Sequence, residues 1–132
     1  MNTQSTSPNT PHAILYSMDR IRDLDRSLRF YCDALGMQEL RRETFTAAEF
    51  TLVFVGYPDG NSMIELTYNW GEHSYSHGTG YGHIALEVLD IHQTCLHLAG
   101  LGVEITRNPG PMKLANTKPS HSSKTRTAAI LS

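Results

Sequence analysis

The first half of the chain alternates between strand-like and helix-like spacing of its apolar positions. Ala13–Ile21 reads as a strand, and Asp23 follows as a candidate N-cap for a helix whose apolar positions recur at helical spacing up to Leu35. Gly36 stands where a helix C-terminal glycine is expected. The remaining apolar runs predict strands at Met37–Arg42, Phe50–Val55 and Ser62–Tyr68, with a turn at 57–61. The predicted order of this half is β-α-β-β-β.

The second half begins with the same order of elements. The pattern predicts a strand over Gly80–Val88, a helix capped by Asp90 and closed by Gly102, and a strand over Val103–Thr106. Asp90 lies 67 positions after Asp23, so the two halves form an internal repeat of a mixed α and β unit. The similarity stops after Lys113.

Two polar residues interrupt apolar strand-like runs, Glu65 in the first half and His83 in the second. A buried polar group is costly unless it is paired or bound to a metal, and Glu with His suits a borderline divalent ion such as nickel, cobalt or zinc. Under the repeat offset, His83 corresponds to Tyr16 and Glu65 to Ser132. A phenol with an ordinary pKa of about 10 is a harder ligand to deprotonate at neutral pH than imidazole. The repeat therefore predicts a site with only two strong ligands.

Composition and charge exclude several classes of protein. The chain has 132 residues, enough for one domain with a core, and a net charge of −2. This balance gives no electrostatic reason to expect binding of nucleic acid or an anionic membrane, and no apolar run reaches the roughly 18 residues of a membrane span. The polar residues 1–12 predict a flexible N-terminal arm rather than a secretory signal, and we expect a cytoplasmic protein.

The cysteines and the tail complete this part of the interpretation. Cys32 and Cys95 each fall among the apolar positions of a predicted helix, which favours two reduced packing thiols over a disulfide or a reactive thiol. Residues 114–132 are rich in Ser, Thr and Lys, and no Asp or Glu follows Glu104. We expect a divergent, disordered tail there.

Several long segments carry a family resemblance, above all Ile64–Gly71 (IELTYNWG), Gly80–Leu86 (GYGHIAL) and Gly110–Lys113 (GPMK). In these segments the chain resembles glyoxalase I (lactoylglutathione lyase) of the short bacterial type, in the vicinal oxygen chelate superfamily. The resemblance implies an α+β fold of paired βαβββ modules. The glyoxalase-like domain would span 13–113, with a first module at 13–71 and a partial second module at 80–113.

The resemblance also implies site residues and partners. Glu65 and His83 fall on two of the family's four metal-ligand positions, and Tyr16 stands at a third as a doubtful ligand. The fourth ligand, the family's usual catalytic base, lies in a segment absent here, which leaves Glu65 as the only catalytic candidate. The implied cofactor is one divalent ion per site, nickel favoured over zinc, in a homodimer with sites between subunits. The implied substrate-binding residues are Arg20, Asn69, His83 and Lys113.

The implied reaction is isomerisation of the methylglyoxal–glutathione hemithioacetal to S-D-lactoylglutathione, a detoxification of methylglyoxal, in a form impaired by the altered ligand positions. The alternative is a catalytically inactive truncated homologue or a thiol- or glutathione-binding protein. A thiol transferase of the same superfamily fits less well, because Glu65–Gly71 is characteristic of glyoxalases.

Simpler roles for these residues also exist: a paired or edge-exposed carboxylate for Glu65, a surface ion pair for Arg20, and packing for Tyr68 and Trp70. His12 and His121 are weaker substitute ligands, and His73, His77, His92 and His97 are interpreted as loop or solvent-facing residues.

Overall fold

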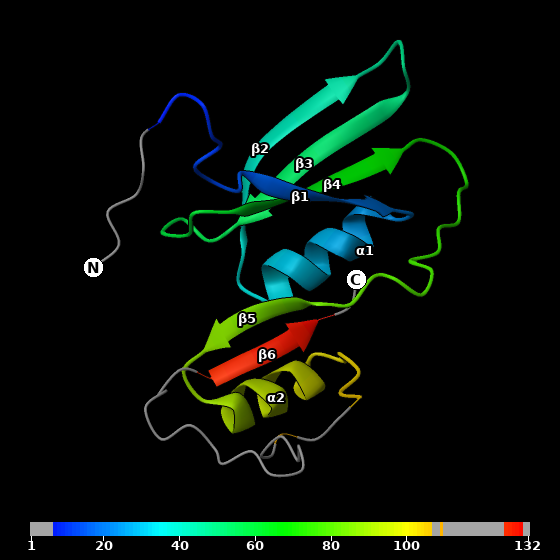
Figure 1. Ribbon diagram of the computed structural model, residues 1–132. Coiled ribbons are helices and arrows are strands. Elements are labelled where there is room, and N and C mark those ends of the chain that lie inside the picture. The colour runs from blue at the N-terminus through cyan, green and yellow to red at the C-terminus, as the bar shows by residue number, and fades with distance from the viewer. Residues whose placement is uncertain (1–6, 107–108, 110–125, 131–132) are drawn as a thin grey trace. The chain divides into compact units, whose positions relative to one another are not determined.

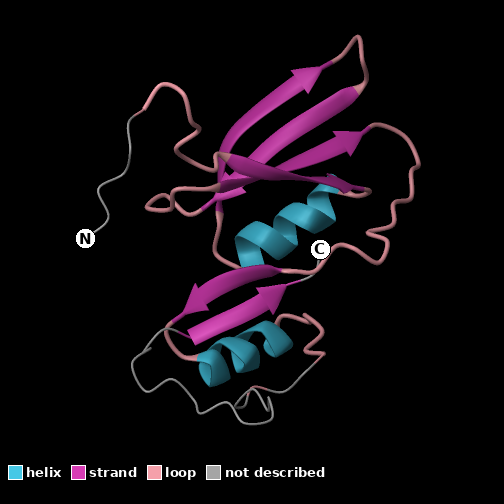
Figure 2. Cartoon of the chain, viewed as in Figure 1, coloured by secondary structure: helices cyan, strands magenta, loops and turns pink. Residues whose placement is uncertain are grey.

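The structure, a computed structural model, describes residues 7–106, 109 and 126–130, the last five by their backbone. It divides into two compact units, Met1–Tyr75 and Ser76–Ser132, which are considered separately. Figures 1 and 2 show the elements along the chain. They are β1 (Tyr16–Ile21), α1 (Leu24–Leu28), η1 (a π-helical turn, Arg29–Ala34), β2 (Gln38–Phe45), β3 (Phe50–Gly56), β4 (Met63–Asn69), β5 (Ile84–Val88), α2 (Ile91–Gly100) and β6 (Arg126–Ile130).

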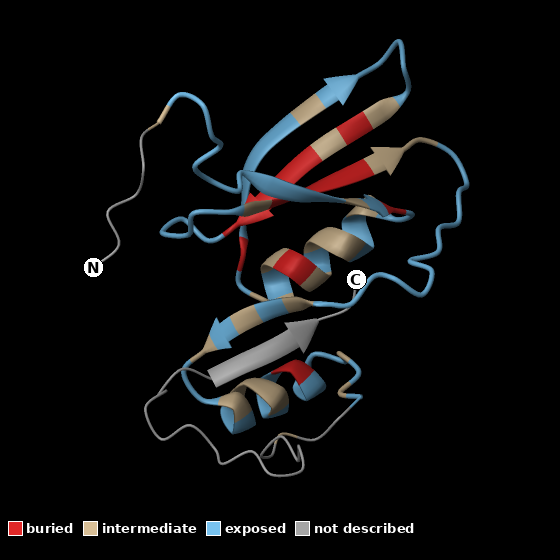
Figure 3. Cartoon of the chain, viewed as in Figure 1, coloured by how far each residue is buried: buried red, intermediate tan, exposed pale blue. Residues whose placement is uncertain are grey.

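The first unit is a four-stranded sheet in the order β1-β4-β3-β2, covered by α1 and η1. Strand β1 runs parallel to β4, whereas β3 runs antiparallel to both β4 and β2. The strands β3 and β4 are therefore the inner pair. They hold most of the buried residues of this unit, as Figure 3 shows, because each is flanked by strands on both sides.

The core of the first unit lies on the helical side of the sheet. Val53, Val55 and Leu66 are fully buried there, and Tyr31 of η1 is buried as well. β-Branched residues suit this pleated, buried surface, and each fully buried apolar side chain contributes about 1.5–3 kcal/mol relative to its exposed state. The side chains of the alternate residues of β4 therefore lie on the opposite face of the sheet.

Local sequence explains where the helices begin and end. Asp23 Oδ1 accepts a hydrogen bond from the backbone N–H of Arg26 at 3.0 Å, and Asp90 Oδ1 accepts one from that of His92 at 3.0 Å. Gly36 has φ +74°, a conformation that glycine adopts without steric cost, and its N–H donates to the carbonyl of Cys32. The two predicted N-caps and the predicted glycine end of the first helix are confirmed.

The second unit contains β5 and β6, which pair antiparallel with Ile84 opposite Ile130, and the helix α2. The strand predicted over Gly80–Val88 is shorter than expected, since β5 begins at Ile84. The strand predicted over Val103–Thr106 is wrong: these residues alternate in polarity but join no ladder among the described residues. A period-two pattern alone does not supply the neighbouring strand that hydrogen bonding requires.

The tail also differs from expectation. Residues 126–130, part of the tail 114–132 that was predicted to be disordered, form β6 beside β5. This short run, Arg-Thr-Ala-Ala-Ile, becomes extended because β5 offers it a hydrogen-bonding edge, a partner that is distant in sequence. The other residues of the tail, 114–125 and 131–132, lie outside the described residues, as do residues 1–6 of the predicted arm.

The expected module limits, 13–71 and 80–113, stay predictions, although the division of the chain at 75/76 falls between them. In the first unit, β1 begins at Tyr16 rather than Ala13, and β2 extends past Arg42 to Phe45. No helix in the described part of the chain is long and apolar enough to cross a membrane.

Candidate functional site

One face of the sheet in the first unit gathers the site residues predicted from β1 and β4. Met18 is paired with Glu65 and Arg20 with Thr67 across these strands. Paired residues point to the same face, and residues two apart along a strand share it. Tyr16, Arg20, Glu65 and Asn69 therefore lie on one face, opposite the core that Leu66 and Val53 form with the helices.

Glu65 is nearly buried, with 9% of its surface exposed, on the inner strand β4. Its cross-strand neighbours on this face are Met18 and Phe54, both without charge. Among the described residues the ion pairs are Arg41–Glu43 and Arg42–Glu39, and Glu65 belongs to neither. Both simpler roles for Glu65, a paired carboxylate and an edge position, are wrong for this part of the chain. A carboxylate in such surroundings needs a cationic or hydrogen-bonding partner from elsewhere.

Tyr16 opens β1, where its ring meets Phe54 edge-on with 5.3 Å between ring centroids. The guanidinium of Arg41 lies over the same Phe54 ring, 4.1 Å from its centroid, in a cation–π contact. Phe54 is therefore buried on a face that is otherwise partly open, and Tyr16 remains 45% exposed. Tyr16 lies two residues before Met18 in β1, and Met18 is the cross-strand neighbour of Glu65.

Arg20 and Asn69 occupy this same face with different neighbours. Arg20 is exposed and takes part in neither of the two ion pairs among the described residues, so the simpler role of a surface ion pair is wrong there. Asn69 is the last residue of β4, and its Nδ2 donates to Tyr75 Oη at 3.1 Å. The structure thus brings a guanidinium and an amide to the face that holds Glu65.

Thr67 is a further polar residue of this face, and the sequence pattern did not single it out. It lies between Glu65 and Asn69 on the same face of β4, opposite Arg20. Its Oγ1 is buried and has no hydrogen-bond partner among the described residues, a condition that calls for an explanation in a folded protein. The sequence feature that indicates Thr67 is the period-two alternation of Glu65, Thr67 and Asn69 within the ELTYN segment.

The remaining predicted residues lie elsewhere. His83 belongs to the second unit, where it is exposed and directly precedes β5. Lys113 and the position of Ser132, as well as His121, lie outside the described residues. His12 is exposed in the segment before β1.

The donor atoms of the described residues do not make up a complete metal site. No group of three or more His, Cys, Asp or Glu residues in the described part of the chain could hold a metal ion. The first unit offers the carboxylate of Glu65 and the phenol of Tyr16 on one face, whereas structural and catalytic sites for zinc-like ions use three or four His, Cys or carboxylate ligands. The described residues alone therefore do not fit such an ion.

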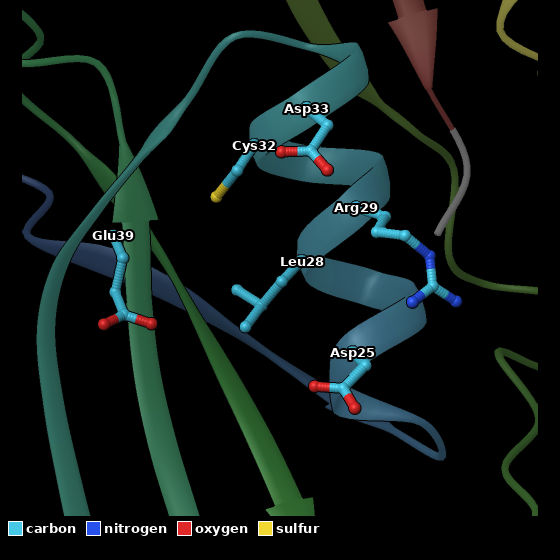
Figure 4. A pocket seen from close by; sticks show the side chains of 6 residues that line it. All are labelled: Asp25, Leu28, Arg29, Cys32, Asp33 and Glu39. Carbon is cyan, nitrogen blue, oxygen red and sulfur yellow. The ribbon is translucent and has the colours of Figure 1, made fainter.

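A separate hollow of about 470 Å³ opens beside the first helix (Figure 4). Its lining residues are Asp25, Leu28, Arg29, Cys32, Asp33 and Glu39. Burial, and then the charges of Asp33 and Glu39, raise the pKa of the Cys32 thiol, which is therefore protonated at neutral pH. The hollow includes none of the predicted site residues, and its three carboxylates would repel an acidic ligand.

The chain matches a known protein family and is similar in sequence to several of its relatives. Residues 14–118 match the Glyoxalase/Bleomycin resistance protein/Dioxygenase superfamily. A probable lactoylglutathione lyase of Synechocystis sp. is 51% identical over 106 residues, which cover 79% of this chain and 81% of that protein. The lactoylglutathione lyase of Haemophilus influenzae is also 51% identical, over 79% of this chain and 78% of its own.

Solved structures give the same grouping. The trypanothione-dependent glyoxalase I of Leishmania major matches with a TM-score of 0.70 and 38% identity, over 76% of this chain and 73% of that one. Glyoxalase I from Zea mays matches with a TM-score of 0.69 and 34% identity, over 76% of this chain and 37% of the maize chain.

Proposed function

The chain belongs to the glyoxalase I family of the vicinal oxygen chelate superfamily, and from this membership we propose that it handles the hemithioacetal of methylglyoxal and glutathione with low or absent turnover. The relatives in Synechocystis and Haemophilus carry the name lactoylglutathione lyase. The reaction proposed for this chain is the one that their name describes, in an impaired form.

The observation that carries the proposal is Glu65, a nearly buried carboxylate without a cationic partner among the described residues. The isomerisation removes a proton from the carbon that bears sulfur and returns it to the neighbouring carbonyl carbon. A carboxylate on a shielded face can accept that proton and give it back, as a general base and then a general acid. Glu65 is the one carboxylate at a family site position, so we assign this role to it.

The neighbours of Glu65 support a glutathione-like ligand. Glutathione is an acidic tripeptide, and a guanidinium such as that of Arg20 binds carboxylates by charge-assisted hydrogen bonds. Thr67 adds a buried hydroxyl without a hydrogen-bond partner among the described residues, and Asn69 adds an amide on the same face. Lys113 and His83 complete the proposed substrate set on the strength of the family resemblance alone.

The expected cofactor is one divalent ion, nickel before zinc, which in this family would act as a Lewis acid. Glu65 and His83 are the residues at ligand positions with suitable chemistry, whereas Tyr16 replaces the first histidine and no carboxylate follows Glu104. We expect weak metal binding for this reason. The homodimer with sites between subunits and the cytoplasmic location are further parts of the proposal that rest on the resemblance.

These same departures favour a second candidate function, a non-catalytic homologue that binds glutathione or another thiol without converting it. Tyr16 and the absence of a late carboxylate remove ligands and the usual base, but they leave Arg20, Thr67 and Asn69 in place. Binding without turnover would distinguish this candidate from the impaired enzyme.

Turnover by the purified chain tests the proposal. With excess nickel, isomerisation of the hemithioacetal should be at least about 100-fold slower than by the Haemophilus relative assayed alongside. Glu65 would have to serve in place of the family's usual base, and a well-positioned general base contributes about 10²–10⁴-fold. Nickel affinity, measured by calorimetry, should be weak and should rise in Tyr16→His, which restores an imidazole. Turnover close to that of the relative would contradict the impairment. Failure to bind S-hexylglutathione would contradict both candidate functions.

A further inference from the structure

We propose that Tyr75 is a positioning residue that fixes the side-chain amide of Asn69 toward the ligand face of the sheet. The inference rests on the proposed function in one respect, since it takes Asn69 to contact the glutathione part of the ligand. Asn69 ends β4 beside the row of Glu65 and Thr67, and its Nδ2 donates to Tyr75 Oη at 3.1 Å. Nothing in the resemblance assigns a role to Tyr75.

The hydrogen bond holds the amide in one rotamer, and in this structure Nδ2 is the amide atom that faces the Tyr75 hydroxyl. With Nδ2 directed at Tyr75, Oδ1 is turned to the other side of the amide plane and is available as an acceptor. The ammonium and peptide N–H groups of a glutathione-like ligand are donors that such an oxygen binds. If the amide could rotate, it would present donor and acceptor at random and would lose ordering entropy on binding.

Tyr75 is itself held in place by His73. The two rings stack with 6.1 Å between centroids and 19° between planes. The His73 Nε2 lies 2.9 Å from the carbonyl oxygen of Trp70, and because a carbonyl only accepts, this nitrogen must carry the proton.

Trp70 connects this loop to the inner strands. Its backbone N–H donates to the carbonyl of Glu49 at 3.0 Å, and its Nε1 donates to Thr51 Oγ1 at 3.0 Å. Thr51 is buried in β3. A continuous set of contacts therefore runs from Thr51 through Trp70, His73 and Tyr75 back to Asn69. We call residues 69–75 the amide clamp.

The contacts within the amide clamp hold this exposed loop in one conformation beside the proposed binding face. Polar contacts made by neighbours of a binding residue hold it in its productive rotamer, and their loss leaves the residue present but mobile. Tyr75 is 40% exposed and does not belong to the buried core among the described residues, so its hydrogen bond to Asn69 is the contact that relates it to the sheet face.

Calorimetric binding of S-hexylglutathione, a non-reactive thioether of the same tripeptide, tests the inference. Tyr75→Phe removes only the hydroxyl and should weaken binding about fivefold, the effect of losing one hydrogen bond of ordinary strength. Tyr57→Phe is the matched control: Tyr57 Oη donates to the carbonyl of Leu35 at 2.6 Å, away from the clamp. The control should bind as the wild type does. Equal affinity of Tyr75→Phe and wild type would overturn the inference.

A double-mutant cycle separates positioning from a general structural role. In an Asn69→Ala background, Tyr75→Phe should cause no further loss of affinity, because Tyr75 acts through the amide that is no longer there. A fivefold loss that persists in this background would show that Tyr75 acts by another route and would overturn the inference.

The side-chain amide of Asn69 gives a readout that does not depend on ligand binding. In ¹⁵N relaxation measurements on the wild-type chain, this NH₂ group should be as ordered as the backbone of β4, and it should become mobile in Tyr75→Phe. If the wild-type chain binds no S-hexylglutathione, the proposed function fails, and this measurement still decides the inference. An Asn69 amide that is equally ordered with and without the Tyr75 hydroxyl would overturn it.

Discussion

At the scale of single residues, burial and pairing separate the two kinds of acidic side chain in the first unit. Glu39 and Glu43 pair with arginines at the surface of β2, where such pairs contribute only about 0–1 kcal/mol. Glu65 is nearly buried and unpaired among the described residues. The sequence marks Glu65 as an interruption of an apolar run, but the uncharged cross-strand neighbours Met18 and Phe54 follow only from the pairing of β4 with β1 and β3.

Cys32 gives a pH-dependent prediction at this scale. Burial, with Asp33 and Glu39, raises its pKa above the ordinary value of 9.0. The folded state then holds the thiol proton more tightly than the unfolded state, so this contribution to stability is complete below pH 9.0 and is lost as the pH rises through the folded pKa. Urea unfolding between pH 8 and 10 should show a smaller loss of stability in Cys32→Ala than in the wild type.

Tyr57 supplies the control, because burial also raises its pKa, from an ordinary value of 10.0. Its effect has the same sign and begins at higher pH. The Tyr57→Phe variant should therefore keep the loss of stability just above pH 9 that Cys32 causes. Identical pH profiles for Cys32→Ala and wild type would contradict this account of the thiol.

At the scale of elements, the turn between β2 and β3 supports the end of β4. Phe45 and Phe50 stack across the two strands with 4.6 Å between centroids, and the carbonyl of Glu49 accepts the N–H of Trp70. Glu49 has φ +58°, and it is the only residue other than glycine with a positive φ in the described part of the chain. An L-residue with a side chain is strained in this left-handed region.

Glu49→Gly should therefore stabilise the first unit by about 0.5–1 kcal/mol, because relief of the left-handed strain exceeds the added entropy of the unfolded chain. Thermal unfolding followed by circular dichroism would measure the change. Ala48→Gly is the matched control: Ala48 has no positive φ, so glycine there should destabilise. A lower melting temperature for Glu49→Gly would show that the glutamate side chain contributes more than the strain costs.

The sequence predicts these elements unevenly, for physical reasons. Asp23, Asp90 and Gly36 act within one helical turn, so their neighbours in sequence are their neighbours in space, and all three predictions hold. The end of β2 follows from its hairpin with β3, where Phe45 lies opposite Phe50, whereas the presence of β6 depends on β5, a partner distant in sequence. The contact of Asn69 with Tyr75 joins a strand end to an irregular loop, and no periodic pattern marks such a contact.

At the scale of the whole molecule, the two units have unequal means of stability. The first has a four-stranded sheet with two inner strands, whereas β5 pairs with β6 alone in the second unit's described sheet. A two-stranded sheet is marginal in water unless it packs on other elements, and only α2 is described beside it in that unit. The second unit should therefore open more readily.

Hydrogen exchange followed by mass spectrometry would measure this difference. Peptides from β3 and β4 should exchange slowest, and peptides from β5 should exchange at least about tenfold faster, since local opening costs less where fewer buried contacts resist it. The edge strand β2 of the first unit is an internal comparison and should lie between the two. Equal protection of β5 and β4 would indicate that the two units unfold as one.

The alternation of β4 has a genetic consequence. Ile64, Leu66 and Tyr68 face the helices, while Glu65, Thr67 and Asn69 lie on the opposite face of the sheet. Deleting one codon between Met63 and the middle of this strand would exchange the two sets, placing a carboxylate in the core and leucine on the opposite face. Such a protein would be strongly destabilised, so selection for folding alone preserves the alternation of apolar and polar positions in the ELTYN segment. The alternation can therefore persist in a lineage whether or not this face of the sheet binds a ligand.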